Sequence, residues 1–378
     1  MRFPEFTEEW KNTSLGKIGK TFNGLTGKSG SDFGQGFPYI TYKSIFDNSK
    51  IDISRVEYVE ITDVERKKET QNKVQYGDVF FTTSSETPDE VGMSSVLLDE
   101  IKDCYLNSFC FGYRLNSLSK TVPEYMRFYL RSQTIRKKMF VLAQGSTRFN
   151  ISKGEVMGMS INIPEIEEQR KIANLLTLLD DRIATQNKII ERLETLIKGL
   201  RNEIFWKLRK NVGFNAMIGD VLDYEQPQSY IVEDTEYIDK GTPVLTANKA
   251  FILGYTSETE GIYDKGDCII FDDFTLDSKY VDFPFKVKSS AIKILTAENK
   301  ELLRYTFEFL KYLDLSTSEH KRHYIAETQN QEFILPTTQI VRTIAHTFSI
   351  LSLRMETAIK QRLLFEKQKQ YLLRQMFI

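Results

Sequence analysis

The chain has 378 residues, of which 41% are hydrophobic and 27% are charged, and its 51 Lys and Arg residues nearly balance its 52 Asp and Glu residues. This composition is ordinary for a folded globular protein and allows two or three domains. No apolar run approaches the ~18 residues of a membrane span, and the N-terminal segment lacks a signal-peptide core, so we expect a cytoplasmic protein. Three cysteines without CxxC spacing indicate neither a disulfide framework nor a zinc site.

Residues 1–163 predict a first globular domain with mixed α and β structure. Runs of β-favouring residues alternate with turns rich in Gly and Asn, and these runs begin at Tyr39, Ile51, Asp78, Ser95 and Phe109. A polar loop from Gly145 to Ser152 leads to a last strand at 160–163.

A single helix is expected between these strands and the polar loop. Thr121 is placed to cap it, and Pro123 falls in its first turn. Helical spacing predicts a core-facing row, which comprises Tyr125, Phe128, Tyr129, Ile135 and Met139. The basic residues are expected to face solvent, and these are Arg127, Arg131, Lys137 and Lys138.

Residues 164–210 predict a first long helix. Its apolar residues recur at alternating spacings of three and four, which is the pattern of a helix that packs against a partner helix. The seam residues are Leu176, Leu179, Ile183, Ile190, Leu193, Ile197 and Leu200. A helix of roughly 45 residues would span about 68 Å at 1.5 Å per residue, so we interpret it as a spacer.

Residues 211–335 predict a second globular domain that repeats the landmarks of the first in the same order. Gly77-Asp-Val-Phe-Phe has its counterpart in Gly266-Asp-Cys-Ile-Ile, and Arg148-Phe-Asn-Ile in Arg322-His-Tyr-Ile. A helix at 297–313 corresponds to the helix after Thr121. Two copies of one scaffold that carry different loops can recognise two different targets.

Residues 336–378 predict a second long helix, so that each half of the chain is one domain followed by one helix. Pro336 corresponds to Pro164, and the same offset of 172 pairs Arg342 with Arg170 and Ile344 with Ile172. Two charged residues interrupt the second seam, whose apolar members are Ile344, Phe348, Leu351, Met355, Phe365 and Leu372. The gap-free repeat indicates a tandem duplication.

Catalytic motifs are absent from the sequence. No Gly-rich loop has the context of a dinucleotide site or a P-loop, and the Asn-Pro-Pro-Tyr or Asp-Pro-Pro-Tyr motif of amino-methyltransferases is missing. No strand–turn–helix elbow carries a Ser or Cys nucleophile. The acidic residues Asp272, Asp273 and Asp277 lack a nuclease-like spacing and suit a solvated turn. We therefore expect a non-catalytic binding protein without a metal site.

The repeated junctions give the chain a specific resemblance. They are Ile163-Pro-Glu-Ile-Glu-Glu-Gln-Arg-Lys-Ile-Ala and Leu335-Pro-Thr-Thr-Gln-Ile-Val-Arg-Thr-Ile-Ala, and each opens a long helix after a globular region. In their residues and two-copy order they resemble the DNA-specificity subunit of type I restriction–modification enzymes, over nearly the whole chain. The second junction departs from the family pattern, because Ile340-Val341 stands where the first has Glu168-Gln169.

The resemblance implies the architecture and the partners. Residues 1–163 and 211–335 would be target recognition domains, each binding one half of a split double-stranded DNA site. The helices 164–210 and 336–378 would pack antiparallel as the spacer and dock two methylation (M) subunits, and restriction/translocase (R) subunits would join them. S-adenosylmethionine, ATP and Mg²⁺ are expected only in those partner subunits, and no cofactor is expected in this chain.

Charge raises an objection to DNA binding, since DNA-binding proteins usually carry a basic excess. Residues 1–163 have 22 Lys and Arg against 20 Asp and Glu, whereas residues 211–335 have 12 against 22. We expect the cations of the second domain to gather on one face and partner subunits to supply much of the phosphate contact. The alternative is a coiled-coil interaction scaffold whose globular domains bind protein or glycan.

Candidate DNA-binding residues follow from the side chains that can reach base edges from loops and strand ends. In the first domain they are Lys28, Lys43, Thr83, Ser84 and Arg148. In the second domain they are Asn248, Lys249, Lys321, Arg322 and His323. The 320–323 segment is expected to be a solvated basic loop rather than half of a metal site.

Overall fold

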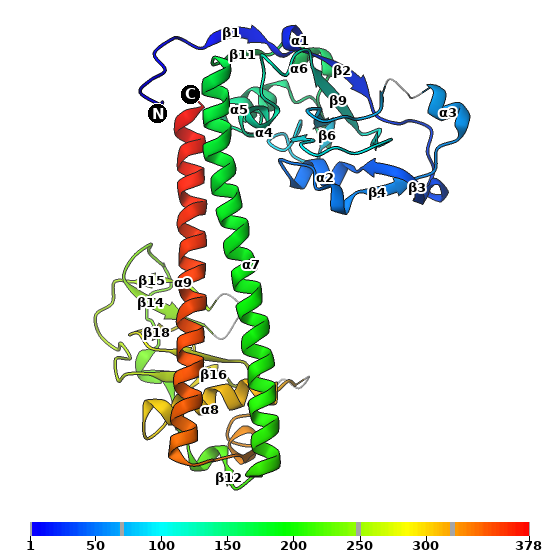
Figure 1. Ribbon diagram of the computed structural model, residues 1–378. Helices are drawn as coiled ribbons and strands as arrows, with labels where there is room; N and C mark the ends of the chain where they lie inside the picture. Colours follow the sequence, from blue (N-terminus) through cyan, green and yellow to red (C-terminus); the bar gives the residue numbers. More distant parts are fainter. Residues whose placement is uncertain (1, 69–71, 247–250, 318–321, 378) are drawn as a thin grey trace. The chain divides into compact units, whose positions relative to one another are not determined.

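The computed structural model describes residues 2–68, 72–246, 251–317 and 322–377 (Figure 1). The fold is α+β, as predicted. The chain divides into two compact units, Met1–Thr185 with Gln361–Ile378, and Gln186–Lys360. Two long helices, Ile166–Asn211 (α7) and Thr338–Met376 (α9), each contribute one segment to each unit. Every unit therefore combines a globular region with a piece of both long helices.

In the described residues, the globular region of the first unit has three larger sheets and one two-residue ladder. The largest is antiparallel in the order Gly19–Asn23 (β2), Cys110–Leu115 (β9), Val79–Thr82 (β5) and Ser94–Val96 (β7). The second has the order Glu57–Val59 (β4), Phe33–Ile40 (β3) and Tyr105–Leu106 (β8). The third pairs Lys11–Ser14 (β1) with Ser160–Ile163 (β11).

Short elements connect and cover these sheets. The helices are Leu15–Ile18 (α1), Tyr42–Asp47 (α2), Asp63–Lys68 (α3), Pro123–Tyr129 (α4), Gln133–Leu142 (α5) and Lys153–Gly158 (α6). A two-residue ladder joins Ser84–Ser85 (β6) to Phe149–Asn150 (β10). The 3-10 turns are Gly30–Asp32 (η1) and Ile53–Arg55 (η2).

The second unit has the same three sheets. The largest has the order Asp223–Glu225 (β13), Ile292–Thr296 (β19), Cys268–Asp272 (β16) and Ser278–Val281 (β17). The next has the order Ile252–Thr256 (β15), Thr242–Leu245 (β14) and Lys286–Val287 (β18). The third pairs Ala216–Met217 (β12) with Glu332–Phe333 (β20). The other elements are Ile218–Asp220 (η4), Pro227–Tyr230 (η5), Lys300–Leu313 (α8) and Thr328–Asn330 (η6).

Topology confirms the tandem duplication. In both units the middle strand of the three-stranded sheet pairs antiparallel with one neighbour and parallel with the other, β3 with β8 and β14 with β18. A local detail repeats as well. A Cβ at Gly16 would lie 3.1 Å from the carbonyl oxygen of Met157, and one at Gly219 would lie 3.2 Å from that of Gln329. The same close approach of backbone therefore recurs at the same place in the fold.

The long helices pack antiparallel within each unit, as predicted. In the first unit the start of α7 meets the end of α9, where Asp180 pairs with Lys369 and Arg182 lies over the ring of Phe365 (Figure 1). In the second unit the end of α7 meets the start of α9, where Arg201 lies over the ring of Phe348. All the predicted seam residues are buried or half-buried.

The C-terminal end of the chain completes the core of the first unit. Phe377 lies with its ring centroid 5.7 Å from those of both Tyr125 and Tyr129, and the Thr134 hydroxyl donates to its carbonyl oxygen at 2.6 Å. Leu372 and Met376 of α9 join the same apolar cluster as Ile172 and Leu176 of α7. The first unit is thus closed by residues that are remote from it in sequence.

Several local predictions were wrong. The single helix after Thr121 is two helices, because the Ser132 side chain accepts from the Ile135 N–H and caps a new helix, α5. Val122, not Thr121, is the N-cap residue of α4. The expected strand at Ile51 is mostly the 3-10 turn η2, since the Asp52 carboxylate accepts from the Ser54 N–H.

Two arginines expected to face solvent are held inside the first unit. Arg131 donates to backbone carbonyl oxygens of Ser94, Ile45 and Phe46, and burial lowers its pKa to about 10. Arg127 pairs with Asp180. The apolar part of an arginine side chain can pack along a core while its guanidinium donates to fixed acceptors. Helical spacing alone does not reveal such buried arginines.

Packing of the seam can be tested with two leucines of α7. Leu176 is fully buried in the first unit, whereas Leu178, two residues away, is 60% exposed. Leu176→Ala should lower the free energy of unfolding by about 2–5 kcal/mol, because it leaves a cavity between the helices. Leu178→Ala should change it by no more than about 0.5 kcal/mol. Urea denaturation followed by circular dichroism measures both, and equal effects would contradict a buried seam.

Candidate nucleic-acid interface

The structure gathers three of the predicted residues of the first domain at one place. Thr83 follows β5, and its N–H and hydroxyl both donate to the Phe109 carbonyl oxygen, at 3.1 and 2.8 Å. Ser84 pairs with Asn150 in the β6–β10 ladder. The carbonyl oxygen of Ser84 accepts a hydrogen bond from the Tyr42 hydroxyl at 2.6 Å. These bonds fix the backbone beside Arg148.

Arg148 immediately precedes β10 and is exposed. The Phe109 side chain is also 64% exposed, next to the anchored Thr83. The site therefore offers an exposed cation and an exposed aromatic ring beside a backbone held by the β6–β10 ladder. Such a combination suits contact with phosphate and base edges.

Lys43 and Lys28 lie in different surroundings. Lys43 is exposed on α2, but it lines a pocket of about 210 Å³ together with Asp47, Asp52 and Glu57. Arg55 also lines the pocket and pairs with Asp52, so three carboxylates stand against two cations and leave a small acidic excess beside Lys43.

The Lys28 ammonium is buried against Glu65, with Nζ at 2.7 and 2.8 Å from the two carboxylate oxygens. The hydrogen bond from Lys28, followed by those from the N–H and hydroxyl of Thr62, holds the pKa of Glu65 at about 2. The charge of Lys28 is thus neutralised within the domain.

In the second domain the structure describes two of the five predicted residues, because Asn248, Lys249 and Lys321 lie outside the described residues. Arg322 is exposed, whereas His323 is only 1% exposed. The His323 N–H donates to the carbonyl and the carboxylate of Asp273, and its Nδ1 lies 2.8 Å from Glu327 Oε2. The solvated loop expected at 320–323 is therefore wrong for His323, which is anchored in the core.

Arg148 and Arg322 correspond in the sequence repeat, and each precedes a segment that bonds near the end of the central strand, although the bonds differ in the two domains. In the first, the Ile151 N–H donates to the carbonyl oxygen of Thr83, which follows β5. In the second, the Tyr324 N–H donates to the carboxylate of Asp273, which follows the equivalent strand β16. Each arginine thus stands next to a segment that is bonded to the end of the same central strand.

Part of the acidic excess of the second domain is internal. Asp272 accepts from the N–H of Phe274 and from the hydroxyl of Thr275, and Asp273 lies 3.4 Å from the ammonium of Lys293. Asp272, Asp273 and Lys293 are all buried. These carboxylates stabilise turns and strand ends, so the count of charges overstates the negative charge that DNA would meet.

Lys153 was not among the predicted residues. Its ammonium donates to the Asn23 side-chain carbonyl at the end of β2 and lies 5.8 Å from the centre of the Phe111 ring. It begins α6, five residues after Arg148. Its position directly after the polar loop that carries Arg148 was the available signal.

The described residues give no sign of metal or membrane chemistry. They contain no group of three or more His, Cys, Asp or Glu side chains arranged to hold a metal ion. In the described ranges no helix is both long and apolar enough to cross a membrane. Cys104, Cys110 and Cys268 are free and buried, and burial raises the pKa of the Cys104 thiol to about 12.

Comparison with known proteins identifies the class. The domain model described as type I restriction modification DNA specificity domain matches residues 7–195, half of the chain. In fold, the chain is similar to the crystal structure of the S subunit of a type I restriction–modification system from M. genitalium. That likeness has a TM-score of 0.70 at 13% identity and covers 100% of this chain and 97% of the other. The chain belongs to the family of type I restriction–modification DNA specificity subunits.

Two curated relatives are similar in sequence. The EcoR124I/EcoR124II specificity subunit of Escherichia coli is 43% identical over 151 residues, which are 38% of this chain and 35% of that protein. The putative MjaX specificity subunit of Methanocaldococcus jannaschii is 29% identical over 206 residues, 54% of this chain and 47% of that protein. The matched segments span about a third to a half of the length of these relatives.

Release of Lys28 should strengthen DNA binding. Glu65→Gln removes its ion-pair partner, so the slope of log affinity against log salt concentration should steepen by about 0.9 if the freed ammonium contacts one phosphate. Glu100→Gln, at an exposed position of the same domain, changes the net charge equally without freeing a lysine. Fluorescence anisotropy with duplex DNA at several salt concentrations measures both slopes. Identical slopes for the two variants would place Lys28 away from DNA.

Proposed function

We propose that this chain is the DNA-binding subunit of a type I restriction–modification enzyme and that it recognises a target in two parts. Residues 1–163 and 211–335 are the target recognition domains in this proposal, and residues 164–210 and 336–378 are the spacer helices. The observation that carries it is the equivalent placement of exposed Arg148 and Arg322 on two copies of one scaffold. Different loops around equivalent cations allow each copy to bind its own half-site.

The chain itself supplies recognition and leaves chemistry to partners. Two methylation subunits that bind S-adenosylmethionine would modify the target, and restriction/translocase subunits that use ATP and Mg²⁺ would cleave unmodified DNA. The absence of a catalytic motif from the sequence and the membership of a specificity family support this division of labour. The site of action is the cytoplasm, where the DNA is.

The near balance of 51 basic and 52 acidic residues fits a subunit that binds DNA as part of a complex. Much of the affinity of a DNA-binding protein comes from contacts with phosphate. With charge close to zero over the chain, most phosphate contacts would come from the methylation subunits. We infer that this chain alone binds DNA weakly and that its side chains contribute selectivity.

Sequencing of methylated adenines provides the direct test. DNA modified by the complex of this chain with methylation subunits should carry methyl groups within a motif of two short sequences separated by unrecognised base pairs. Replacement of residues 1–163 by the corresponding domain of another specificity subunit should change one half of that motif and leave the other half unchanged. Methylation without a split motif would support the interaction-scaffold alternative.

The two equivalent arginines should affect different halves of the target. Arg148→Gln and Arg322→Gln should each weaken specific binding roughly tenfold, in line with about 1–3 kcal/mol for a base contact. Relaxed base preference should appear in one half-site for each variant. Lys120→Gln is the control, because Lys120 is exposed beside Gln169 at the start of α7. Methylation of a library with randomised half-sites measures the preference, and relaxation of the same half by both variants would contradict the assignment.

A further inference from the structure

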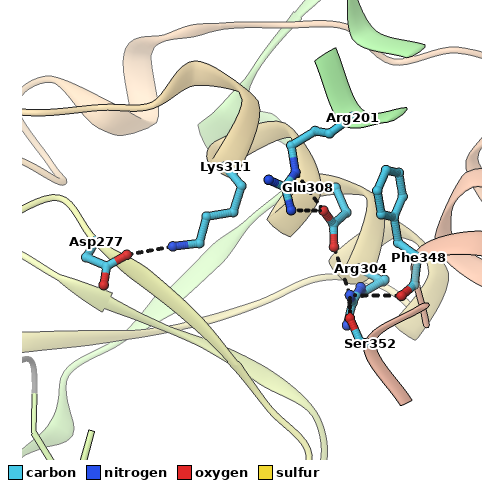
Figure 2. Close-up of polar contacts among 7 residues, drawn as sticks. All are labelled: Arg201, Asp277, Arg304, Glu308, Lys311, Phe348 and Ser352. Carbon is cyan, nitrogen blue, oxygen red and sulfur yellow. Dashed lines mark hydrogen bonds and ion pairs between the residues drawn. The ribbon is translucent and has the colours of Figure 1, made fainter. Parts of the chain in front are cut away.

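A buried charge cluster joins the helix α8 of the second recognition domain to both long helices. Figure 2 shows Glu308 of α8 between two arginines. Arg201 of α7 donates from Nε and Nη2 to Glu308 Oε2 at 2.9 and 2.8 Å, and Arg304 Nη2 donates to Oε1 at 2.8 Å. Arg304 Nη2 also donates to Ser352 Oγ of α9 at 2.5 Å and to the Phe348 carbonyl oxygen at 3.3 Å.

The first unit has a corresponding cluster. Arg127 of α4 donates from Nη2 to Asp180 Oδ2 of α7 at 2.6 Å, and from Nε to Ser49 Oγ at 3.0 Å. The Lys369 ammonium of α9 donates to the other oxygen of Asp180. One recognition-domain helix is therefore tied to both long helices here as well.

The two arginines are equivalent in the duplicated fold. Arg127 is the fifth residue of α4, which begins at Pro123, and Arg304 is the fifth residue of α8, which begins at Lys300. Their partners on the long helices are equivalent too, because Asp180 lies 16 residues after Pro164 and Ser352 lies 16 residues after Pro336. In each unit one arginine of the domain thus bonds to the same position of the helix that follows it.

The carboxylate of each cluster has a different origin. In the first unit it is Asp180 of the long helix, whereas in the second it is Glu308 of the domain helix itself. Arg131 corresponds to Glu308 in the duplicated fold. Arg131 comes four residues after Arg127, and Glu308 comes four residues after Arg304. Arg131 donates to the backbone of its own domain instead. The arginine contact has been retained while its surroundings differ.

We propose that Arg127 and Arg304 are positioning residues that fix the orientation of each recognition domain on the helix pair, and thereby the half-site separation that the protein accepts. The second part of this inference rests on the proposed function. Apolar contacts between domain and helices are non-directional, so they permit small rotations. A guanidinium with several fixed acceptors has a rigid geometry, and its bonds are strong where water is excluded.

Hydrogen exchange tests the docking without DNA. Arg127→Gln in the full chain assembled with methylation subunits should raise amide exchange about tenfold in 126–130 and 178–182, as expected for the loss of one charge-assisted hydrogen bond. Arg304→Gln should do the same in 303–310 and 350–354. Arg127→Lys and Arg304→Lys keep the charge but remove the planar guanidinium, through which Arg127 donates from Nε and Nη2 and Arg304 from Nη2 alone, so they should give smaller increases. Arg374→Gln, at an exposed arginine of α9 outside these four segments, is the control.

Methylation of DNA with altered spacing tests the positioning role. Substrates with the natural separation of half-sites, one base pair fewer and one base pair more are compared. In each glutamine variant the ratio of off-spacing to natural methylation should rise about tenfold, the change that one such bond supports.

The outcomes separate the two proposals. Unchanged exchange in the glutamine variants overturns the docking role, whatever the DNA result. Raised exchange with an unchanged spacing ratio also overturns the inference, because the arginines then stabilise the fold without setting the separation. Absence of a split motif in DNA modified by the unaltered complex counts against the proposed function instead, and the exchange experiment still decides the docking role.

Discussion

The apolar seam between α7 and α9 is the interaction on which both units depend. Each helix carries a row of Leu, Ile and Phe that would face water if the helix stood alone, and burial of one such side chain contributes about 1.5–3 kcal/mol. The two helices are separated by a whole domain in sequence. Each unit consequently forms around chain segments that meet only in the folded protein, as Phe377 does when it packs against the stacked rings of Tyr125 and Tyr129.

The buried ion pairs make directional contacts between the globular regions and the long helices, which apolar packing does not. Buried ion pairs add little net stability, because desolvation offsets much of their attraction. Removal of one partner is nevertheless strongly destabilising, because the other charge is then buried without compensation. The clusters around Asp180 and Glu308 are placed where a recognition domain meets the helices. Their physical effect is to select one arrangement of domain and helix among the many that the apolar contact would tolerate.

The two copies share one scaffold but differ at the junctions where the long helices begin. Glu168 is buried and accepts both donors of an Arg2 fork at 2.7 Å, while Gln169 bonds to the Val122 N–H and to the carbonyl of Pro164. In the second copy the equivalent Ile340 is 38% exposed and Val341 is buried in the apolar core. The polar junction of the first copy is thus an apolar one in the second, and the two helix starts present different surfaces.

The sequence by itself determined the large-scale organisation. Heptad spacing, the constant offset between the long helices and the ordered landmarks were enough for an α+β duplication with paired helices, because helix periodicity and repeats are properties of the chain alone. Strand ends and a polar loop also indicated Thr83, Ser84 and Arg148 as candidates, whereas their proximity is a result of the fold.

Only the tertiary structure decided which polar residues are available. Lys28 looks like a free loop lysine in sequence, yet Glu65, 37 residues later, neutralises it. His323 looks like part of a basic loop, yet Asp273 anchors it in the core. Arg127 and Arg304 look like ordinary cations of a helix face, and their roles depend on partners about 50 residues away, Asp180 and Ser352. Local sequence sets propensity and periodicity, whereas the burial and pairing of a charge depend on the distant segments that fold against it.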